Sequence, residues 1–325
     1  MKEVVLGIDI GGTNTKFGFV DRSGTLLSEH SISTNVHASV ESFLDALHEN
    51  IEKNISALGE VVELIGIGVG APNGNYYDGT IENAPNLRWK GSVNFVKLLQ
   101  SYYDIPAVLT NDANAAAIGE MRFGGAQEMK NFIVITLGTG LGSGIVVNGE
   151  LIYGHDGMAG ELGHTLVNVN GRYCACGKRG CLETYVSATG IKRTIYKLLA
   201  DHNGTSELNG VSFNDLSAEL ITEAAKNGDK IALEAFEYTG RILGMKLSDA
   251  VAHTSPEAIF LFGGLTKAED FIFEPTKRYM EENLLYVYRN KVKLLPSGLQ
   301  DKNAAVLGAA ALAWQELEKS KDNVY

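Results

Sequence analysis

The sequence predicts an α/β protein with two domains. Its 325 residues, 45% of them hydrophobic, suffice for the cores of two ordinary domains of roughly 150 residues each. Short β-branched runs alternate along the chain with segments of helical periodicity, which is typical of α/β folds. A pattern of strand, glycine-rich turn and strand also occurs twice, once in each half. We therefore expect two related halves, with functional motifs at the ends of strands.

The first half begins with three strands. Apolar, β-branched runs predict strands over Val4–Ile10, Thr15–Val20 and Thr25–Ser31. Residues 39–55 place apolar side chains at helical spacing and predict a helix, which a buried strand over Leu64–Gly70 follows. These five elements establish the α/β pattern.

The remaining elements complete the first half and build the second. In the first half we expect a helix near residues 93–101, a strand over Ala107–Thr110 and an alanine-rich helix over Ala113–Met121. In the second half the patterns predict a strand over Phe132–Thr136, an irregular cysteine-bearing loop, helices over about 184–200, 214–226 and 229–252, a strand over Ala258–Phe262, and a last helix over about 303–319. No change in composition marks a linker, so the domain boundary must be inferred from the motifs.

The charge balance and the N-terminus exclude several classes of partner. Lys plus Arg total 28 against 39 Asp plus Glu, and the net charge of −11 repels nucleic acids and anionic membranes. After Met1, Lys2 and Glu3 the chain enters an apolar strand directly, without the basic and long apolar regions of a signal peptide. No later segment has roughly 18 uncharged apolar residues. We expect a soluble, cytoplasmic protein that binds neither nucleic acid nor membrane.

The two glycine turns are related by an internal repeat. Aligning Gly138 with Gly12 gives an offset of 126 (138 − 12). The same offset pairs Thr139 with Thr13, Gly144 with Gly18, and Val146 with Val20. Two copies of strand, glycine-threonine turn and strand are predicted.

The residue types in these turns suit phosphate binding. Glycines without Cβ let backbone N–H groups approach phosphate oxygens, and a threonine hydroxyl adds a donor. A Rossmann site needs a helix after the turn, whereas Thr15–Val20 continues as a strand, and no Walker A sequence is present. A simple hairpin turn remains open for either loop taken alone. Asp9 before the first turn can hold Mg²⁺, and Lys16 after it supplies a positive charge near the phosphates.

Three cysteines and one histidine form a predicted metal site. The chain has only three cysteines, and they lie within eight residues, which favours a metal site in a reducing compartment over disulfides. One imidazole and three thiolates form a closed tetrahedral set for Zn²⁺. Buried cysteines without a ligand, or a redox role, remain the alternatives. The candidate ligands are His164, Cys174, Cys176 and Cys181.

A carboxylate follows the last predicted strand of the first half. Asp112 comes just after the strand that ends at Thr110, at a carboxyl end where α/β folds collect ligands. Asn and Asp are also common helix N-caps, and the residues alone favour capping here.

Together these motifs resemble those of the ROK family, which comprises bacterial sugar kinases and related repressors. Residues 7–16, with the sequence GIDIGGTNTK, resemble the first phosphate motif of that family. Residues 136–142 resemble the second phosphate motif, and residues 262–264 resemble the adenosine motif, so the resemblance extends over essentially the whole chain. It implies the actin-like, hexokinase-like ATPase fold, with two domains, each with a duplicated βα core, around an ATP cleft.

The resemblance also implies the cofactors and the residues that bind them. ATP and Mg²⁺ are expected at Asp9, Gly11, Gly12, Thr13, Lys16, Gly138, Thr139, Gly140, Gly263 and Gly264. In ROK kinases the histidine stands ten residues before the first cysteine, as here (174 − 164), and the zinc is structural.

Further residues are assigned to the sugar by the same resemblance. Asp112 is expected to be the catalytic base, accepting the proton of the sugar's primary hydroxyl. Sugar ligands are expected at Asn83, Asn111, Asp112, Glu161, His164 and Glu183. Taken alone, Glu161 and Glu183 read as solvated surface charges.

The implied function is ATP-dependent phosphorylation of a hexose at its 6-hydroxyl, by a glucokinase. The segment with Pro85, Asn86, Leu87 and Trp89 favours glucose. Asn73 departs from the glycine that most ROK glucokinases have after the proline of this loop. The alternatives are an N-acetylmannosamine or N-acetylglucosamine kinase, a sugar-responsive ROK transcriptional regulator, which the acidic charge disfavours, and a chaperone-like or filament ATPase, which would not need the cysteine loop.

The domain organisation is expected to follow the motifs. We expect a small domain of residues 1–112 plus 303–325 and a large domain of residues 113–302 that carries the zinc loop. The expected partners are a small-molecule hexose and ATP, and the expected assembly is a homodimer or a dimer of dimers.

Overall fold

The fold was derived from a computed structural model that describes residues 1–58, 62–202, 205–299 and 303–322. The chain divides into a first unit of Met1–Met129, Leu151–Ala159 and Gly298–Tyr325, and a second unit of Lys130–Glu150 and Gly160–Ser297. The division expected from the motifs differs from these units at residues 113–129, 151–159 and 298–302, which belong to the first. Among the described residues, no helix has both the length and the apolar character needed to cross a membrane.

The first unit is built on a five-stranded mixed sheet with the order β3-β2-β1-β4-β8. Its three N-terminal strands pair antiparallel, whereas β1, β4 and β8 run parallel. The strands are β1 Lys2–Ile10, β2 Asn14–Asp21, β3 Leu26–Ser33, β4 Val62–Ala71 and β8 Ala107–Asn111. A smaller antiparallel sheet follows β4 and contains β5 Gly74–Asn75, β6 Thr80–Glu82 and β7 Ser92–Val93.

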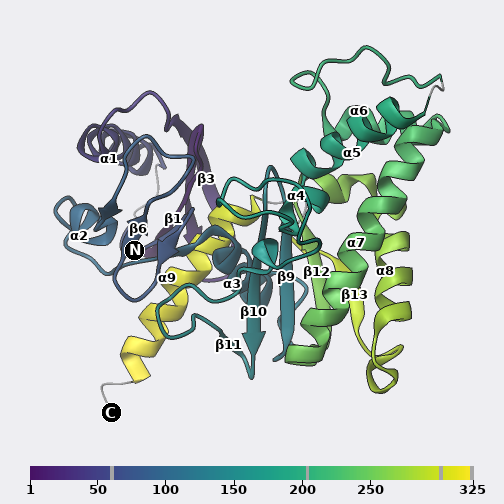
Figure 1. The fold of residues 1–325 in the computed structure, drawn as a ribbon. Coiled ribbons are helices and arrows are strands. Elements are labelled where there is room, and N and C mark those ends of the chain that lie inside the picture. The colour runs from purple at the N-terminus through teal and green to yellow at the C-terminus, as the bar shows by residue number, and fades with distance from the viewer. Residues whose placement is uncertain (59–61, 203–204, 300–302, 323–325) are drawn as a thin grey trace. The chain divides into compact units, whose positions relative to one another are not determined.

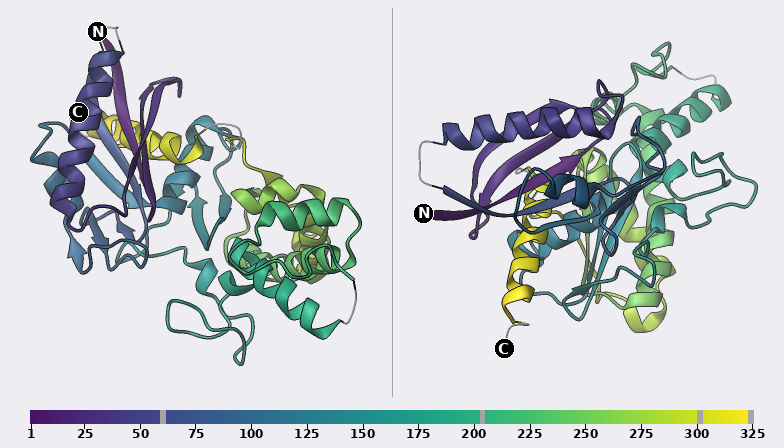
Figure 2. Two further views of the ribbon diagram at one scale, coloured as in Figure 1. Left: turned by 90° about the horizontal axis from the view of Figure 1, so that it is seen from above. Right: turned by 90° about the vertical axis from the view of Figure 1, so that its left-hand side faces the viewer.

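Helices accompany this sheet (Figure 1). They are α1 Val40–Ala57, α2 Phe95–Gln100, α3 Asp112–Phe123 and α9 Ala304–Asp322. The apolar stripe of α1 enters the first core, where Phe43 packs on the rings of Trp89 and Phe95. On the other face, α9 packs on β1, β4 and α3, as two views of the ribbon show (Figure 2). Helices therefore cover both faces of the sheet, which leaves the ends of its strands for function.

Glycines let α9 lie close to the sheet. A Cβ atom at Gly7 of β1 would collide with the backbone oxygen of Val306, and one at Gly68 of β4 with that of Ala309. The buried face of α9 is rich in alanine, so its backbone can reach the strands. The same helix touches α3 where Gly119 meets Gly308. This packing places α3 in the first unit.

The second unit repeats the sheet of the first. Its order is β11-β10-β9-β12-β13, with β9 and β10 antiparallel and β9, β12 and β13 parallel. The strands are β9 Phe132–Leu137, β10 Leu141–Val147, β11 Glu150–Leu151, β12 Ala258–Phe262 and β13 Lys293–Pro296. Replacing each strand by its counterpart in chain order converts one sheet into the other. The predicted repeat, and with it the duplicated α/β core, is confirmed.

Helices make up most of the rest of the second unit. They are α4 Glu183–Val186, α5 Ala188–Asp201, α6 Ala218–Lys226, α7 Lys230–Thr254 and α8 Asp270–Asn283, with short 3₁₀ turns η1 Leu162–His164, η2 Gly264–Ala268 and η3 Tyr286–Tyr288. The long helices α7 and α8 lie side by side, because Gly240 and Gly244 admit the backbone of α8 (Figure 1). The single helix expected over about 184–200 is two helices, because Ser187 is extended and caps α5 by accepting the N–H of Gly190.

Candidate active site

The carboxyl edge of the first sheet collects polar residues from three strands. Asp9 of β1 lies opposite Gly70 of β4, and Gly70 lies opposite Thr110 of β8. The carboxyl ends of these parallel strands thus bring Asp9 near Asn111 and Asp112, and the charge of Asp112 acts on Asp9. Lys16 is the cross-strand partner of Asp9 in the β1–β2 hairpin. The edge therefore carries two carboxylates and one ammonium group.

Asn111, rather than Asp112, is the N-cap of helix α3. The Oδ1 atom of Asn111 accepts the N–H of Ala113 at 2.9 Å, and its backbone is extended. Asp112 is the first residue of the helix, and its Oδ1 accepts the same N–H at 2.9 Å. Because Asn111 supplies the cap, the second carboxylate oxygen of Asp112 is not needed to begin the helix. Capping thus explains Asn111 better than it explains Asp112.

Both carboxyl groups of this edge have raised pKa values. Desolvation by burial, and secondly the negative charge of Asp112, raise the pKa of Asp9 to about 7, while Lys16 opposes the shift. Desolvation also raises the pKa of Asp112, against the N–H donors of Ala113 and of Asp112 itself. Protein atoms crowd the carboxyl group of Asp112, but one side of the residue stays open, so its side chain is exposed to solvent. Water reaches the exposed side of this residue, which limits the rise of its pKa.

The first glycine turn is tightly packed. The N–H of Gly11 donates to the backbone oxygen of Asn14 at 3.0 Å, and the oxygen of Thr13 accepts the N–H of Thr34 at 2.8 Å. A Cβ at Gly12 would lie 2.7 Å from the backbone oxygen of Asn86, so only glycine fits. The segment after β6 is therefore held directly against the turn.

Two asparagines near the turn adopt left-handed backbone conformations. Asn83 has a φ of 46°, and its Oδ1 accepts the N–H of Gly91 at 3.2 Å, so this oxygen is used within the chain. Asn73 has a φ of 52°, and its Nδ2 donates to the backbone oxygen of Glu82 at 2.9 Å. Asparagine tolerates this conformation better than other non-glycine residues do. Asn73 thus adopts a backbone conformation that glycine also favours.

The tyrosines of the same loop pack against residues 151–159 of the first unit. The ring of Tyr76 stacks on that of Tyr153 with 4.0 Å between centroids, and its hydroxyl donates to Glu316 at 2.8 Å. The hydroxyl of Tyr77 donates to the backbone oxygen of Gly154 at 2.9 Å. Sequence reasoning missed Tyr153, because its partners lie far away along the chain. Both tyrosines of the loop are therefore engaged by the chain itself.

The second glycine turn lies between β9 and β10. Gly138 and Thr139 are exposed, and a Cβ at Gly138 would meet no atom within 4 Å. In the strands beside it, the N–H of Gly142 donates to the hydroxyl of Thr136 at 3.1 Å. Gly263 follows β12 with a φ of 112°, and a Cβ there would lie 2.6 Å from the oxygen of Leu137. The second unit thus brings Gly138, Thr139, Gly140, Gly263 and Gly264 to one end of its sheet.

Glu183 contacts both this turn and the cysteine loop. Its Oε2 accepts the backbone N–H of Leu141 at 3.0 Å, and its Oε1 lies 3.6 Å from Sγ of Cys174 as an acceptor. The contact with Leu141 was not predicted from the sequence. Its only local signal is that Glu183 comes two residues after Cys181 in a loop that the cysteines bring together.

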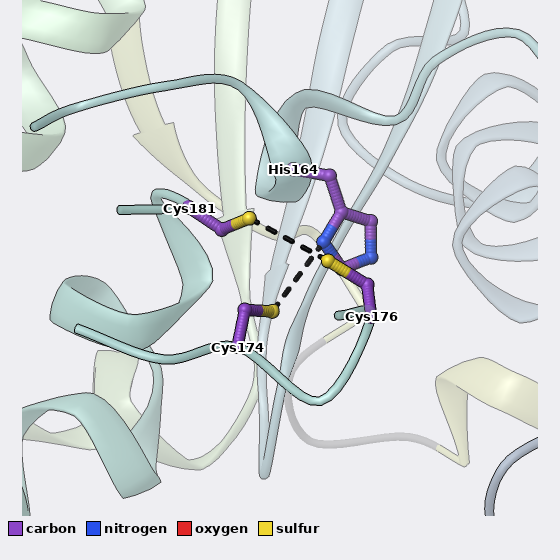
Figure 3. A group of neighbouring side chains, drawn as sticks. All are labelled: His164, Cys174, Cys176 and Cys181. Carbon is purple, nitrogen blue, oxygen red and sulfur yellow. Dashed lines mark hydrogen bonds between the residues drawn. The ribbon is translucent and has the colours of Figure 1, made fainter. Parts of the chain in front are cut away.

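The cysteine loop brings the four predicted metal ligands together. Their ligand atoms all lie within 4.8 Å of one another, with Nδ1 of His164 3.8 Å from Sγ of Cys174 and the Cys176 and Cys181 sulfurs 3.6 Å apart (Figure 3). Burial raises the pKa of the Cys174 thiol to about 12, so it ionises at neutral pH only beside a positive charge. A set of one imidazole and three sulfurs at such distances is suited to tetrahedral Zn²⁺.

The other ring nitrogen of His164 faces a carboxylate. Nε2 of His164 lies 3.8 Å from Oε2 of Glu161, whose side chain is exposed. The segment that carries Glu161 is fixed by Ser143, whose hydroxyl donates to the oxygen of Gly160 and accepts the N–H of Leu162 at 3.2 Å. The two ring nitrogens thus face different groups, Nδ1 the Cys174 sulfur and Nε2 the Glu161 carboxylate.

The sequence-selected residues therefore form one group in each unit. The first unit brings together Asp9, Lys16, Asn111, Asp112 and the glycine turn, with Asn83 in the segment that packs on that turn. The second unit connects Glu161, His164, the cysteines, Glu183 and the second turn.

Comparison with known proteins gives the family. The sequence model of the ROK family matches residues 5–316. A glucokinase from Halalkalibacterium halodurans is 33% identical over 98% of this chain and 97% of its own length.

Solved structures of the family have the same fold. A ROK family glucokinase from Streptomyces griseus, solved in complex with glucose and AMPPNP, is 32% identical with a TM-score of 0.81, covering 96% of this chain and 99% of that one. A ROK family transcriptional regulator, a homolog of the E. coli MLC protein, is 26% identical with a TM-score of 0.86, covering 96% and 78%. A putative N-acetylmannosamine kinase from Listeria monocytogenes is 25% identical with a TM-score of 0.77, covering 97% and 99%. The fold is therefore the actin-like, hexokinase-like α/β fold, and this chain belongs to the ROK family.

Proposed function

We propose that this protein is an ATP-dependent sugar kinase that phosphorylates the 6-hydroxyl of glucose. The observation that carries the proposal is the pair of carboxylates, Asp9 and Asp112, at the carboxyl edge of the first sheet. Lys16 and the glycine turn adjoin the pair, and the chain belongs to a family that includes ATP-binding glucokinases.

In this proposal Asp112 is the catalytic base. It accepts the proton of the sugar hydroxyl and directs that oxygen at the γ-phosphorus of ATP. A loose transition state for phosphoryl transfer needs little early deprotonation, so the position of the carboxylate matters more than its basicity. Asn111 uses its Oδ1 to cap α3, so its amide nitrogen is the group available for a sugar oxygen.

The phosphates are assigned to the two turns and their flanking charges. The N–H groups of Gly12 and Gly140 and the hydroxyls of Thr13 and Thr139 are suited to phosphate oxygens, and Gly263 and Gly264 to the adenosine. Gly11 shapes the first turn, because its own N–H donates to the backbone oxygen of Asn14. Lys16 adds a positive charge. Asp9 would hold Mg²⁺, which supplies charge neutralisation during phosphoryl transfer.

The remaining sugar ligands come from the second unit. Glu161 and His164 form an imidazole–carboxylate pair that can accept and donate hydrogen bonds to hydroxyl groups. Glu183 keeps unused lone pairs after its contacts with Leu141 and Cys174, so a sugar hydroxyl can also donate to it. We assign a structural zinc ion to His164 and the three cysteines, since the donor set fits and its thiolates close the coordination sphere.

Glucose is favoured over N-acetylated hexosamines by the loop after β4. An acetyl group needs an apolar pocket, and Tyr76 and Tyr77 are the large side chains of this loop. Both tyrosines instead stack or hydrogen-bond with residues of their own unit. N-acetylmannosamine is the alternative substrate, because the Listeria relative is named as a putative N-acetylmannosamine kinase.

A coupled assay of ADP release over a panel of hexoses tests the proposal. We expect glucose to give a higher kcat/KM than N-acetylglucosamine and N-acetylmannosamine. A higher value for either N-acetylated sugar would replace the glucokinase assignment but keep the kinase. Sugar binding without ADP release from any hexose would instead support a regulator, the function of the structural relative with a TM-score of 0.86.

A further inference from the structure

The second glycine turn is held at both ends by the short segment that follows the cysteine loop. At one end, Oε2 of Glu183 accepts the backbone N–H of Leu141 at 3.0 Å. At the other end, the backbone N–H of Ala188 donates to the oxygen of Gly138 at 2.9 Å. Glu183 is the first residue of α4, and Ala188 is the first residue of α5. One segment of six residues therefore contacts both sides of the turn.

Gly140 gives independent support for the importance of this contact. A Cβ at Gly140 would collide with Oε2 of Glu183, and the backbone of Gly140 is not in the left-handed region. The space beside Gly140 is thus taken by the Glu183 carboxylate, and a side chain here would have to displace that carboxylate. Gly138 differs, since a Cβ there would meet no atom within 4 Å. The turn and Glu183 are therefore fitted to each other.

Glu183 is also fixed from behind by the cysteine loop. Its Oε1 lies 3.6 Å from Sγ of Cys174. The start of α4 is held by the backbone, where the N–H of Thr184 donates to the oxygen of Cys181 at 3.0 Å. Because Cys181 stands two residues before Glu183 and its carbonyl accepts the Thr184 N–H, the cysteine loop determines where α4 begins and so where the Glu183 carboxylate lies.

We propose that Glu183 is a positioning residue for the nucleotide, which holds the Gly138–Leu141 turn in its phosphate-binding shape from the cysteine loop. This inference rests on the proposed function, and it goes beyond the sugar contact assigned to Glu183 there. The carboxylate accepts the Leu141 N–H and so orients the peptide that joins Gly140 to Leu141. The orientation of this peptide helps to set the directions in which the turn presents its backbone N–H groups. Phosphate binding by these groups depends on those directions.

The test is the affinity for Mg–ADP, measured by calorimetry with no sugar present. For Glu183→Ala we expect the affinity to fall about tenfold or more, the loss typical of a charge-assisted hydrogen bond. Glu183→Gln should lose less, because its amide oxygen still accepts the Leu141 N–H. Glu223→Gln on the exposed face of α6 is the matched control and should bind as the wild type does. Zinc content, measured on each variant, should stay the same.

A double-variant cycle with Gly140 tests the contact between Glu183 and the turn directly. Gly140→Ala should weaken Mg–ADP binding in the wild type and much less in the Glu183→Ala background, because the colliding carboxylate is gone. Additive losses, or an unchanged ADP affinity in Glu183→Ala with a lowered sugar affinity, would overturn the inference. A wild-type protein that binds no Mg–ADP would instead overturn the proposed function.

Discussion

The two glycine turns of this protein both join antiparallel strands, but they differ in the charged residues beside them. In the first hairpin Ile10 pairs with Thr15 and encloses four turn residues, whereas in the second Leu137 pairs with Leu141 and encloses three. One position further from the turn, the pair Asp9 and Lys16 corresponds to the pair Thr136 and Gly142. The charged pair of the first copy is thus replaced by a hydrogen bond of 3.1 Å from the Gly142 N–H to the Thr136 hydroxyl.

This difference shows how duplicated units divide one function. The first turn carries its own carboxylate and ammonium groups within the hairpin. The second hairpin has none at the corresponding pair, and the carboxylate that contacts it, that of Glu183, comes from a helix beyond the cysteine loop. Duplication preserved the backbone that suits phosphate, while the charges were placed locally in one copy and remotely in the other. The following predictions test this division, beginning with the largest expected effect.

Asp112→Asn tests the charged edge of the first unit. We expect turnover to fall by about 100-fold or more, because the amide cannot accept the sugar proton. Sugar affinity should change little, since the geometry survives. Steady-state kinetics and sugar titration measure the two effects, with Asp104→Asn on the exposed loop before β8 as the control. Retention of more than about a tenth of turnover would remove Asp112 as the base.

Cys176→Ser tests whether the metal site supports the sugar ligands of the second unit. Metal analysis should find about one zinc per wild-type chain and much less in the variant. The free energy of unfolding should fall by roughly 3 kcal/mol or more, because the loop loses its cross-link. Sugar affinity should fall too, since His164 and Glu183 lose their support. A metal-free preparation with full activity and unchanged thermal stability would count against the zinc site.

Lys16→Met removes the ammonium group that the second hairpin lacks. We expect the KM for ATP to rise about tenfold, as for a lost charge-assisted contact. Lys16 lowers the pKa of Asp9, so its removal should raise that pKa further. The acid limb of the kcat/KM profile should then move to higher pH. An unchanged profile would show that Asp9 does not limit activity at low pH.

Asp9→Asn should make the folded protein more stable while it impairs catalysis. The folded-state pKa of about 7 lies above the usual value, so the ionised carboxylate costs folding free energy. This cost is absent below the unfolded pKa of about 4, grows as pH rises and is complete above about 7. The variant should therefore gain on the order of 1–3 kcal/mol at pH 8 and almost nothing at pH 4. Denaturant unfolding at both pH values measures the gain in the free energy of unfolding. An equal gain at both would contradict ionisation of Asp9 as its cause.

Much of the fold could be predicted because its signals are local. The strands beside the two glycine turns and the long helix α7 follow from periodicity and turn residues within short windows. Helix α8 was missed, because it is highly charged and has Pro275 inside it. Strand β13 was missed because its four residues end in a proline. The break at Ser187 was missed because the apolar pattern continues through it, although serine is among the favoured N-cap residues.

The candidate site, like the fold, could be predicted only where its signals are local. The spacing of the cysteines and the composition of the turns predicted which residues gather, because neighbours in sequence stay neighbours in a loop. The contact of Glu183 with Leu141 joins residues 42 apart, and no local pattern encodes it. The inclusion of α3 in the first unit likewise depends on the contact of Gly119 with Gly308, far along the chain. Tertiary contacts of this kind required the structure.

The close approach of α9 to the first sheet has a consequence for synthesis on the ribosome. Gly7 and Gly68 are made early, but the helix backbone that covers them begins only at residue 304. Until then, one face of the first sheet lacks its cover, while the strands of the second unit, which end at Pro296, are already available. The unit that begins first during translation is thus completed last. A nascent chain that stalls before α9 would display a glycine-lined, apolar sheet face to chaperones.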